Sequence, residues 1–157
     1  MANENSEERS PEAAAITDLI LTIFRCNGRL MRSGDSLLRD LELTSARWQV
    51  LGAIVRMPRT VAQIARHYEL TRQGVLWVVQ SMLKDGIVEL TKNPDHKRAK
   101  LVRLTEKGRE VYDEIDRRQR HWSNEVGIAF SVAEVQAATD CVRRLGEIAK
   151  GNDEEDE

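Results

Sequence analysis

The hydrophobic period of the sequence changes once, at Gly86, and that change limits the possible folds more than any other feature. Before Gly86, apolar residues recur at helical spacing, and the glycine stands where a helix end favours a left-handed residue. After it come two short runs rich in β-branched and aliphatic residues, 87–91 and 100–104. The residues between the runs are mostly turn formers and basic side chains, which is typical of an extended hairpin loop. The sequence therefore predicts a mainly α fold of the α+β class with one antiparallel β-hairpin.

Two short helices are predicted directly before the hairpin. The segment 60–63 (Thr-Val-Ala-Gln) fits a capping box that opens a helix over 61–67, and Thr71 caps a second helix over 71–84. A short turn at Glu69-Leu70 joins them, so their lengths are those of a helix-turn-helix. A hairpin after such a pair makes a winged helix. Its second helix, the recognition helix, enters the DNA major groove, and the hairpin, the wing, contacts the backbone or minor groove.

Longer helices are predicted on both sides of the winged helix. Ser10 and Pro11 begin the first one, which Gly34-Asp35 is expected to end before a short helical piece over 37–43. Another helix begins at Thr44 and ends at Met57-Pro58. A long helix is predicted to follow Thr105, and a second capping box, over 131–134, opens the last helix.

The first and last predicted helices carry apolar faces outside the winged helix. On the last helix the spacing of apolar residues is close to a heptad, as in helices that pack against one another. Their length and position at both ends favour a bundle between two subunits, while packing within one chain is the alternative. The predicted dimerisation residues are Ile16, Leu19, Ile20, Ile23, Val135, Ala138, Val142 and Leu145.

These elements define a predicted domain organisation. Residues 36–109 form the winged-helix DNA-binding region, and residues 10–35 and 110–150 form the dimerisation helices, all in one continuous domain. The acidic ends, 1–9 and 151–157, are predicted to be disordered because they are polar and highly charged.

The distribution of charge supports a nucleic-acid partner that the net charge conceals. The 157 residues include 24 Lys and Arg and 26 Asp and Glu, a net charge of -2. Residues 56–109 hold 12 of those basic and 5 of those acidic residues, a balance of +7, so the remainder carries 12 minus 21, or -9. A charged segment is often only a solvated face. Here the positive excess falls on the predicted recognition helix and wing, which favours a DNA-binding surface.

Particular side chains on these two elements suit DNA. Arg and Gln make bidentate contacts with guanine and adenine edges, and basic wing residues suit phosphates or a narrow minor groove. The recognition-helix candidates are Thr71, Arg72, Gln73, Leu76, Trp77, Gln80 and Lys84. The wing candidates are Lys92, His96, Lys97, Arg98 and Lys100.

Several motifs together resemble the MarR-type transcriptional regulators. They include Leu-Thr-Ser-Ala-Arg-Trp-Gln-Val-Leu at 43–51 and the step from the wing into Leu-Thr-Glu-Lys-Gly at 104–108. The similarity covers residues 36–112 and implies an obligate homodimer with interlaced terminal helices. It also implies binding to a pseudo-palindromic operator in double-stranded DNA, usually as a repressor. Arg98 falls where such proteins carry the arginine of the wing tip.

Trp77 departs from this pattern, because many relatives have Arg or another polar residue at its position, and Leu76 beside it is also apolar. One interpretation is contact with thymine methyl groups in the major groove. The other is that Trp77 packs against the wing or the preceding helix. A protein-interaction module that has lost DNA binding is a further alternative, although it leaves the basic wing without a purpose.

The resemblance also bears on regulation. Relatives often bind small aromatic or phenolic anions between the dimer helices and the DNA-binding region, and the candidates for such an effector pocket are Phe24, Arg25, Trp48 and Trp122. The alternative is that these four residues are ordinary core or surface. Other relatives sense oxidants through a cysteine of the first helix, where Cys26 stands. Since the expected tyrosines are missing around it, we expect a structural thiol at Cys26.

The sequence offers nothing for catalysis. Its three histidines, His67, His96 and His121, show neither metal-ligand spacing nor a paired nucleophile, and there is no glycine-rich phosphate loop. We therefore predict no enzyme activity, metal or cofactor. No apolar run reaches the ~20 residues of a membrane span. No secretory leader is visible, and two cysteines make no disulfide framework, so we expect a cytoplasmic protein.

Overall fold

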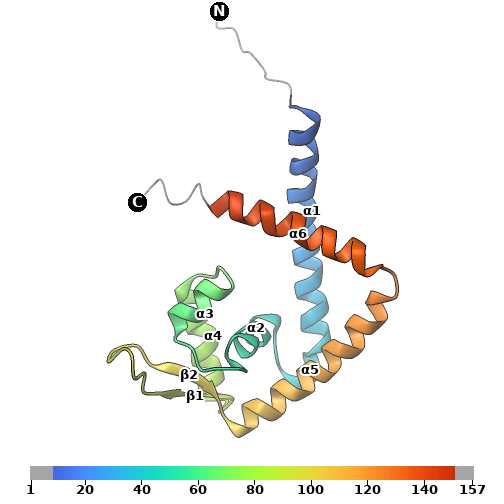
Figure 1. Cartoon of the computed structure of the whole chain (residues 1–157). Coiled ribbons are helices and arrows are strands. Elements are labelled where there is room, and N and C mark those ends of the chain that lie inside the picture. Colours follow the sequence, from blue (N-terminus) through green and yellow to red (C-terminus); the bar gives the residue numbers. More distant parts are fainter. Residues whose placement is uncertain (1–8, 151–157) are drawn as a thin grey trace, which may run out of the picture. The chain divides into compact units, whose positions relative to one another are not determined.

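The computed structural model describes residues 9–150 and has the order of elements of a winged helix-turn-helix, which confirms the predicted fold class (Figure 1). Its helices are α1 (Pro11–Leu37), α2 (Ser45–Ile54), α3 (Val61–His67), α4 (Arg72–Lys84), α5 (Glu106–Gly127) and α6 (Val132–Lys150). Its strands are β1 (Val88–Thr91) and β2 (Leu101–Leu104). Apart from Arg9, the ends predicted to be disordered lie outside the described residues. No helix within 9–150 is long and apolar enough to cross a membrane.

The chain divides into two compact units between Ile115 and Asp116. The first unit contains α1 to α4, the hairpin and the first part of α5. The second contains the rest of α5 and α6.

The first helix is longer than predicted. It begins at the predicted cap, where Ser10 Oγ accepts a hydrogen bond from the Ala13 N–H at 3.2 Å, but it continues through Gly34 and Asp35 to Leu37. The expected break at these residues is therefore wrong. Only a short 3-10 turn, Arg39–Leu41, follows.

Contacts with α2 explain why a Gly-Asp pair stands inside a helix. A methyl group at Gly34 would lie 2.5 Å from Ser45 Oγ, so the missing side chain lets the start of α2 approach α1. Asp35 Oδ1 accepts a hydrogen bond from the Ser45 N–H at 2.7 Å, and Ser45 Oγ donates to the Met31 carbonyl at 3.0 Å. The bonds from the backbone and side chain of Ser45 hold the pKa of Asp35 below its ordinary value. These two residues join α1 to α2 and do not end the helix.

The core of the first unit lies between α2, α3, α4 and the hairpin. Leu51, Ile64 and Met82 come from the three helices, and Val102 from β2 and Ile115 from α5 close the same cluster. All five side chains are fully buried, and such residues each contribute about 1.5–3 kcal/mol to folding. The core therefore fixes the position of the recognition helix, α4, in this unit.

The predicted local signals around the helix-turn-helix are confirmed. Thr60 and Gln63 form the capping box of α3, with bonds of 2.8 and 3.2 Å in the two directions. Gly86 follows α4 with a φ of 68°, the left-handed conformation in which glycine is unstrained. The strands pair antiparallel with Val88 opposite Leu104. Arg59 adds an antiparallel bridge to Val102, which ties the wing to the start of α3.

In the second unit, α6 exposes its apolar side chains. Ser131 and Glu134 form the predicted capping box, with bonds of 2.8 and 3.2 Å. None of the residues of α6 is buried, and Val135 is 50% exposed. Both thiols are exposed as well, so neither Cys26 nor Cys141 belongs to the core of the protomer.

Candidate nucleic-acid interface

The recognition helix turns one face to the core and leaves the other exposed. Val75, Val79 and Met82 are its buried residues, and its N-terminus is capped by Thr71, whose Oγ1 accepts from the Gly74 N–H at 3.1 Å. All the recognition-helix candidates lie on the exposed side: Thr71, Arg72, Gln73, Leu76, Trp77, Gln80 and Lys84. The helix therefore presents hydrogen-bonding side chains, one basic residue near each end and an aromatic ring on the same surface.

Trp77 is exposed to 65% of its surface, which excludes the interpretation that it packs against the wing or α3 within the protomer. The reason is its place on the helix: it stands two residues from both Val75 and Val79, on the side opposite the buried face. Leu76, by contrast, is 36% exposed and faces a hollow beside the wing.

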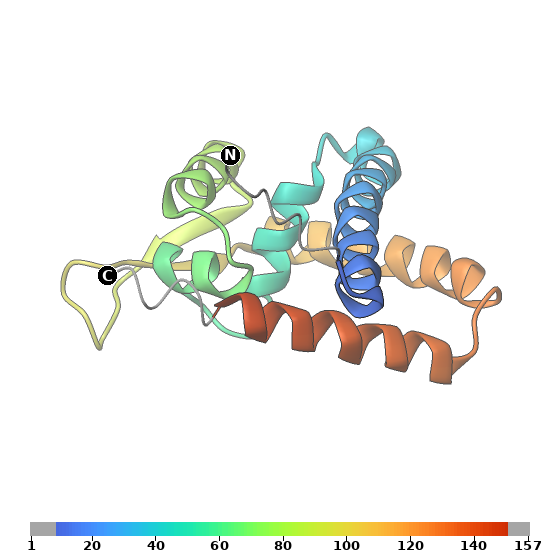
Figure 2. The ribbon, with the colours of Figure 1, turned by 90° about the horizontal axis from the view of Figure 1, so that it is seen from above.

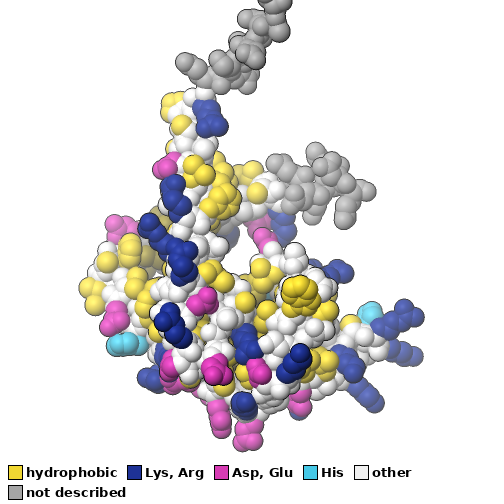
Figure 3. Space-filling view, turned by 180° about the vertical axis from the view of Figure 1, so that it is seen from behind, with side chains coloured by type: hydrophobic (Ala, Val, Ile, Leu, Met, Phe, Trp, Pro, Cys, Tyr) yellow, Lys and Arg dark blue, Asp and Glu magenta, His cyan; other side chains and the backbone are white. Residues whose placement is uncertain are grey.

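The wing projects from the helices as a long loop between β1 and β2 (Figure 2). Its basic candidates, Lys92, Lys97, Arg98 and Lys100, are all exposed. Blue Lys and Arg side chains gather at this projecting tip beside one histidine in Figure 3. Such a concentration of cations on a protruding loop is suited to phosphate contacts.

His96 has a place in the wing that the sequence did not reveal. Its Nδ1 accepts hydrogen bonds from the backbone N–H groups of Arg98 at 3.3 Å and Ala99 at 3.2 Å. Asn93 Oδ1 accepts from the Asp95 N–H at 3.0 Å in the same loop. The histidine was predicted as a contact to DNA, and in the structure its ring also shapes the backbone that carries Arg98.

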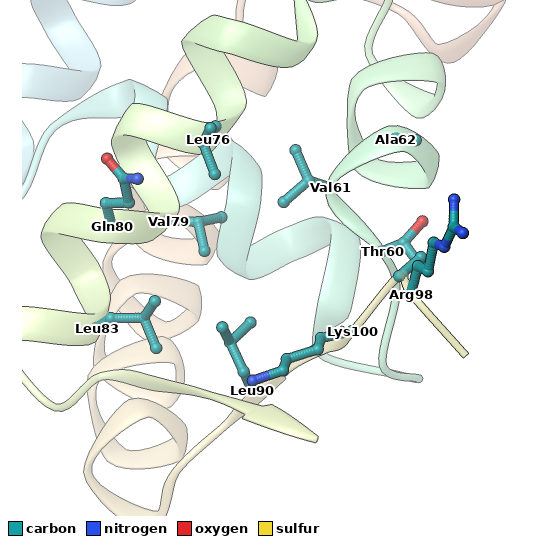
Figure 4. Close-up of a pocket in the computed structure, with 11 residues that line it drawn as sticks. Thr60, Val61, Ala62, Leu76, Val79, Gln80, Leu83, Leu90, Arg98 and Lys100 are labelled. Carbon is teal, nitrogen blue, oxygen red and sulfur yellow. The ribbon is translucent and has the colours of Figure 1, made fainter. Parts of the chain in front are cut away.

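A hollow of about 470 Å³ lies between α3, α4 and the wing. In Figure 4, Val61 from α3, Leu76 from α4 and Leu90 from β1 line it with aliphatic side chains. Arg98 and Lys100 stand at its edge, and the Arg98 guanidinium is turned away from it (Figure 4). The hollow lies between the recognition helix and the wing, so a ligand that contacts both elements has to span it.

The sequence motif Leu-Thr-Glu-Lys-Gly fastens the end of the recognition helix to α5. Thr105 Oγ1 donates to the carbonyl oxygens of Gly86 at 2.7 Å and Ile87 at 3.1 Å. Lys107 Nζ donates to the Asp85 carbonyl at 2.8 Å. Gly108 is buried because α5 passes so close to Ile87 that a methyl group there would lie 2.0 Å from the Ile87 carbonyl oxygen.

The remaining candidates lie outside this interface. On α1, Ile16 is exposed while Leu19, Ile20 and Ile23 are half-buried, and on α6 Val135, Ala138 and Val142 are exposed while Leu145 is half-buried. Of the effector-pocket candidates in the first unit, Phe24 is 68% exposed, Arg25 is exposed, and Trp48 is half-buried beside Gly34. Trp122 is half-buried in the second unit. Across residues 9–150, no cluster of three or more His, Cys, Asp or Glu side chains could hold a metal ion.

Known proteins resemble this chain in sequence, and solved structures resemble it in fold. The model of the MarR family matches residues 41–99. The chain is 38% identical over 130 residues to the uncharacterized protein Rv2011c of Mycobacterium tuberculosis, a match that covers 83% of this chain and 91% of that protein. It is 27% identical over 140 residues to the transcriptional activatory protein BadR of Rhodopseudomonas palustris, covering 86% and 79% of the two chains. The structure of CouR from Rhodococcus jostii RHA1 bound to p-coumaroyl-CoA superposes with a TM-score of 0.74 at 19% identity, covering 82% and 91%.

Members of this family are transcription regulators and not enzymes, and the winged helix described above is the fold that they share. The chain belongs to the MarR family of transcriptional regulators.

Proposed function

We propose that this regulator is a cytoplasmic homodimer that binds a pseudo-palindromic operator in double-stranded DNA. Its binding would repress transcription. The observation that carries the proposal is the exposed face of α4 beside a basic, projecting wing. The residues from 56 to 109, which include both elements, carry a balance of +7 within a chain of net charge -2. A local positive surface of this kind attracts DNA, while the acidic remainder repels it.

The two elements would read DNA in different ways. Arg72 and Gln73 stand on the first turn of α4, where side chains of a recognition helix meet base edges, and both suit bidentate contacts. Gln80 and Lys84, farther along the helix, would lie nearer the phosphates. Arg98 and its basic neighbours would enter the minor groove or contact the backbone beside it.

The homodimer is supported by apolar faces whose residues the protomer leaves exposed or only half-buried. One winged helix makes few contacts with DNA, and two of them about 34 Å apart match successive turns of the major groove. The faces on α1 and α6 are long and apolar, and exposed apolar surface of that extent is typical of a subunit interface. We propose that the predicted dimerisation residues pack against a second copy of the chain.

For regulation, we propose release from DNA by a small aromatic or phenolic anion. Phe24 and Arg25 are both exposed on α1, and an aromatic ring and a guanidinium are groups that suit such a ligand. CouR is named with p-coumaroyl-CoA bound, which is an aromatic acyl group on a polyanion. Oxidation of exposed Cys26 is the alternative signal, and a protein-interaction module without DNA binding is the alternative function. Since BadR is named an activator, the position of the operator relative to the promoter would decide the direction of regulation.

A titration of labelled duplex DNA at several salt concentrations tests the DNA-binding part of this proposal. We expect the logarithm of the binding constant to fall linearly with the logarithm of salt, by about 0.9 for each phosphate neutralised. Mass measurement on the complex should give two copies of the chain for each operator duplex. A protein-interaction module would show no binding at any salt concentration.

Replacing Trp77 with alanine should remove a preference for thymine at one base pair of each half-site. An exposed indole at the major-groove surface can contact the thymine methyl group, and burying one such group stabilises a complex by about 0.8 kcal/mol. The measurement compares the operator with the same duplex in which deoxyuridine replaces thymidine at single positions. Wild-type protein should lose affinity at one position and the Trp77→Ala variant should not. Equal losses for both proteins at every position would remove Trp77 from base readout.

A further inference from the structure

The end of the recognition helix is held from a second side, by an arginine of α2. Arg47 Nη2 lies 2.7 Å from Asp85 Oδ2 and donates a hydrogen bond to Ser81 Oγ. The Arg47 side chain is only 18% exposed. Ser81 stands in the last turn of α4 and Asp85 is its C-cap, so one guanidinium contacts both residues. We call the contacts of Arg47 with Ser81 and Asp85 the α2–α4 clamp.

The clamp adds polar contacts at the C-terminal end of α4, whose length is also held by the core contacts of Val75, Val79 and Met82. Lys107 of α5 already bonds to the Asp85 carbonyl from the other side. At the opposite end, the Thr71 cap bonds to Gly74 of the same helix. The first turn, which carries Arg72 and Gln73, precedes Val75, the first buried residue of α4, and lies at the end of the helix opposite the clamp.

The α2 end of the clamp is itself tied to α1. Ser45, two residues before Arg47, bonds to Asp35 and to the Met31 carbonyl, both on α1. Gly34 keeps the two helices in close contact at the same point. Polar contacts thus join α1 to the first turn of α2, and the same turn to the end of the recognition helix.

We propose that Arg47 is a positioning residue that sets the angle at which the recognition helix meets DNA, and that it links this angle to α1. The proposal rests on the proposed function, since it requires α4 to enter the major groove. A helix of 13 residues is about 20 Å long, so a tilt of about 3° about the end near Asp85 moves the first turn by about 1 Å. A shift of that size is enough to spoil a bidentate contact with a base, while phosphate contacts by the flexible wing tolerate it.

Two residues of the clamp, Arg47 and Asp85, allow a test that separates the effect of charge from the effect of position. Arg47→Gln removes a positive charge and Asp85→Asn removes a negative one. If these residues acted only through their charge, the first change would weaken DNA binding and the second would strengthen it. If the clamp sets the angle of α4, both changes should weaken binding to the operator, by about tenfold, because each variant lacks a hydrogen bond to a charged group.

The experiment measures affinity for the operator and for a random-sequence duplex, for the wild type, Arg47→Gln, Arg47→Lys and Asp85→Asn. We expect operator affinity to fall in all variants, least in Arg47→Lys, with random-duplex affinity changed by less than about twofold. Amide hydrogen exchange in the last turn of α4 should become faster in the same variants. The matched controls are Arg120→Gln and Asp116→Asn, which break an exposed ion pair on α5 and should change neither affinity.

Three results would overturn the proposal. Opposite effects of Arg47→Gln and Asp85→Asn on operator affinity would assign the effect to charge alone. Equal losses on operator and random duplexes would assign it to general loss of the fold. Unchanged operator affinity in both variants would show that the clamp does not position α4. If the wild type itself had no operator, the proposed function would fail, and this inference with it.

Discussion

Replacing Arg98 with alanine should weaken binding of the dimer to its operator by about 10- to 100-fold and flatten the dependence on salt. Arg98 is exposed at the wing tip, and its backbone N–H is held by the His96 ring, so the guanidinium is presented on an ordered loop. A hydrogen bond contributes about 0.5–1.5 kcal/mol net, so the loss of one such contact from each of the two wings of a dimer amounts to about 1–3 kcal/mol. The loss should be similar for operator and random duplexes, because phosphate contacts carry no sequence information.

The measurement is a titration of duplex DNA by the wild type and the Arg98→Ala variant at several salt concentrations. The slope of log affinity against log salt should decrease by about one for each phosphate that the variant no longer neutralises. Arg120→Ala is the matched control, since it removes an exposed arginine of α5 outside the wing. Equal affinity of the variant and the wild type at every salt concentration would remove Arg98 from the interface.

Replacing Gly108 with alanine should lower the free energy of unfolding by about 1–3 kcal/mol. The added methyl group would lie 2.0 Å from the Ile87 carbonyl oxygen, a distance that no alanine can accept without movement of the backbone. That carbonyl cannot move freely, because it also accepts hydrogen bonds from the Thr105 N–H at 3.2 Å and the Thr105 hydroxyl at 3.1 Å. Alanine normally stabilises a helix relative to glycine by about 1 kcal/mol, so the steric cost at Gly108 must exceed this gain for the stability to fall.

Chemical denaturation of the variant and the wild type at equal concentration measures this loss. Gly146→Ala is the matched control, because Gly146 is also inside a helix and a methyl group there would meet no atom of the protomer within 4 Å. The control should be as stable as the wild type or more stable. A Gly108→Ala variant of wild-type stability would mean that α5 does not approach the end of α4 this closely.

The elements of the winged helix could be predicted because their signals are local. The Thr60–Gln63 capping box, the Thr71 cap and the left-handed Gly86 each depend on residues within one turn, and all are present in the structure. Gly34-Asp35 misled the prediction for the opposite reason. A glycine followed by an aspartate is a common helix end, and only the approach of Ser45, ten residues beyond Asp35, explains it inside a helix.

The candidate interface could be predicted in part. Helical spacing placed Arg72, Gln73 and Trp77 on the exposed face of α4, since the buried face was already defined by apolar residues. Spacing could not show that Trp77 leaves the wing untouched, or that the His96 ring bonds to the wing backbone. These contacts depend on the tertiary path of the hairpin.

Sequence patterns could not predict the long-range polar contacts. Arg47 was visible only as part of the motif at 43–51, and its partner Ser81 stands 34 residues later. The Leu-Thr-Glu-Lys-Gly motif was visible as a resemblance, while its geometry, a threonine and a lysine bonded to the turn after α4, came from the structure. In both cases the type of residue does not reveal its role, because the role depends on the distant residue to which its side chain bonds.

Selection of bound sequences from a random pool of duplex DNA tests the central proposal most directly. A dimer with two recognition helices should enrich a pseudo-palindrome whose half-sites are about 10 base pairs apart, centre to centre. The most constrained positions should lie where Arg72, Gln73 and Trp77 would meet the bases, with weaker preferences under the wing. A pool that remains random after repeated selection, with folded protein, would contradict the proposal that α4 and the wing bind a specific operator.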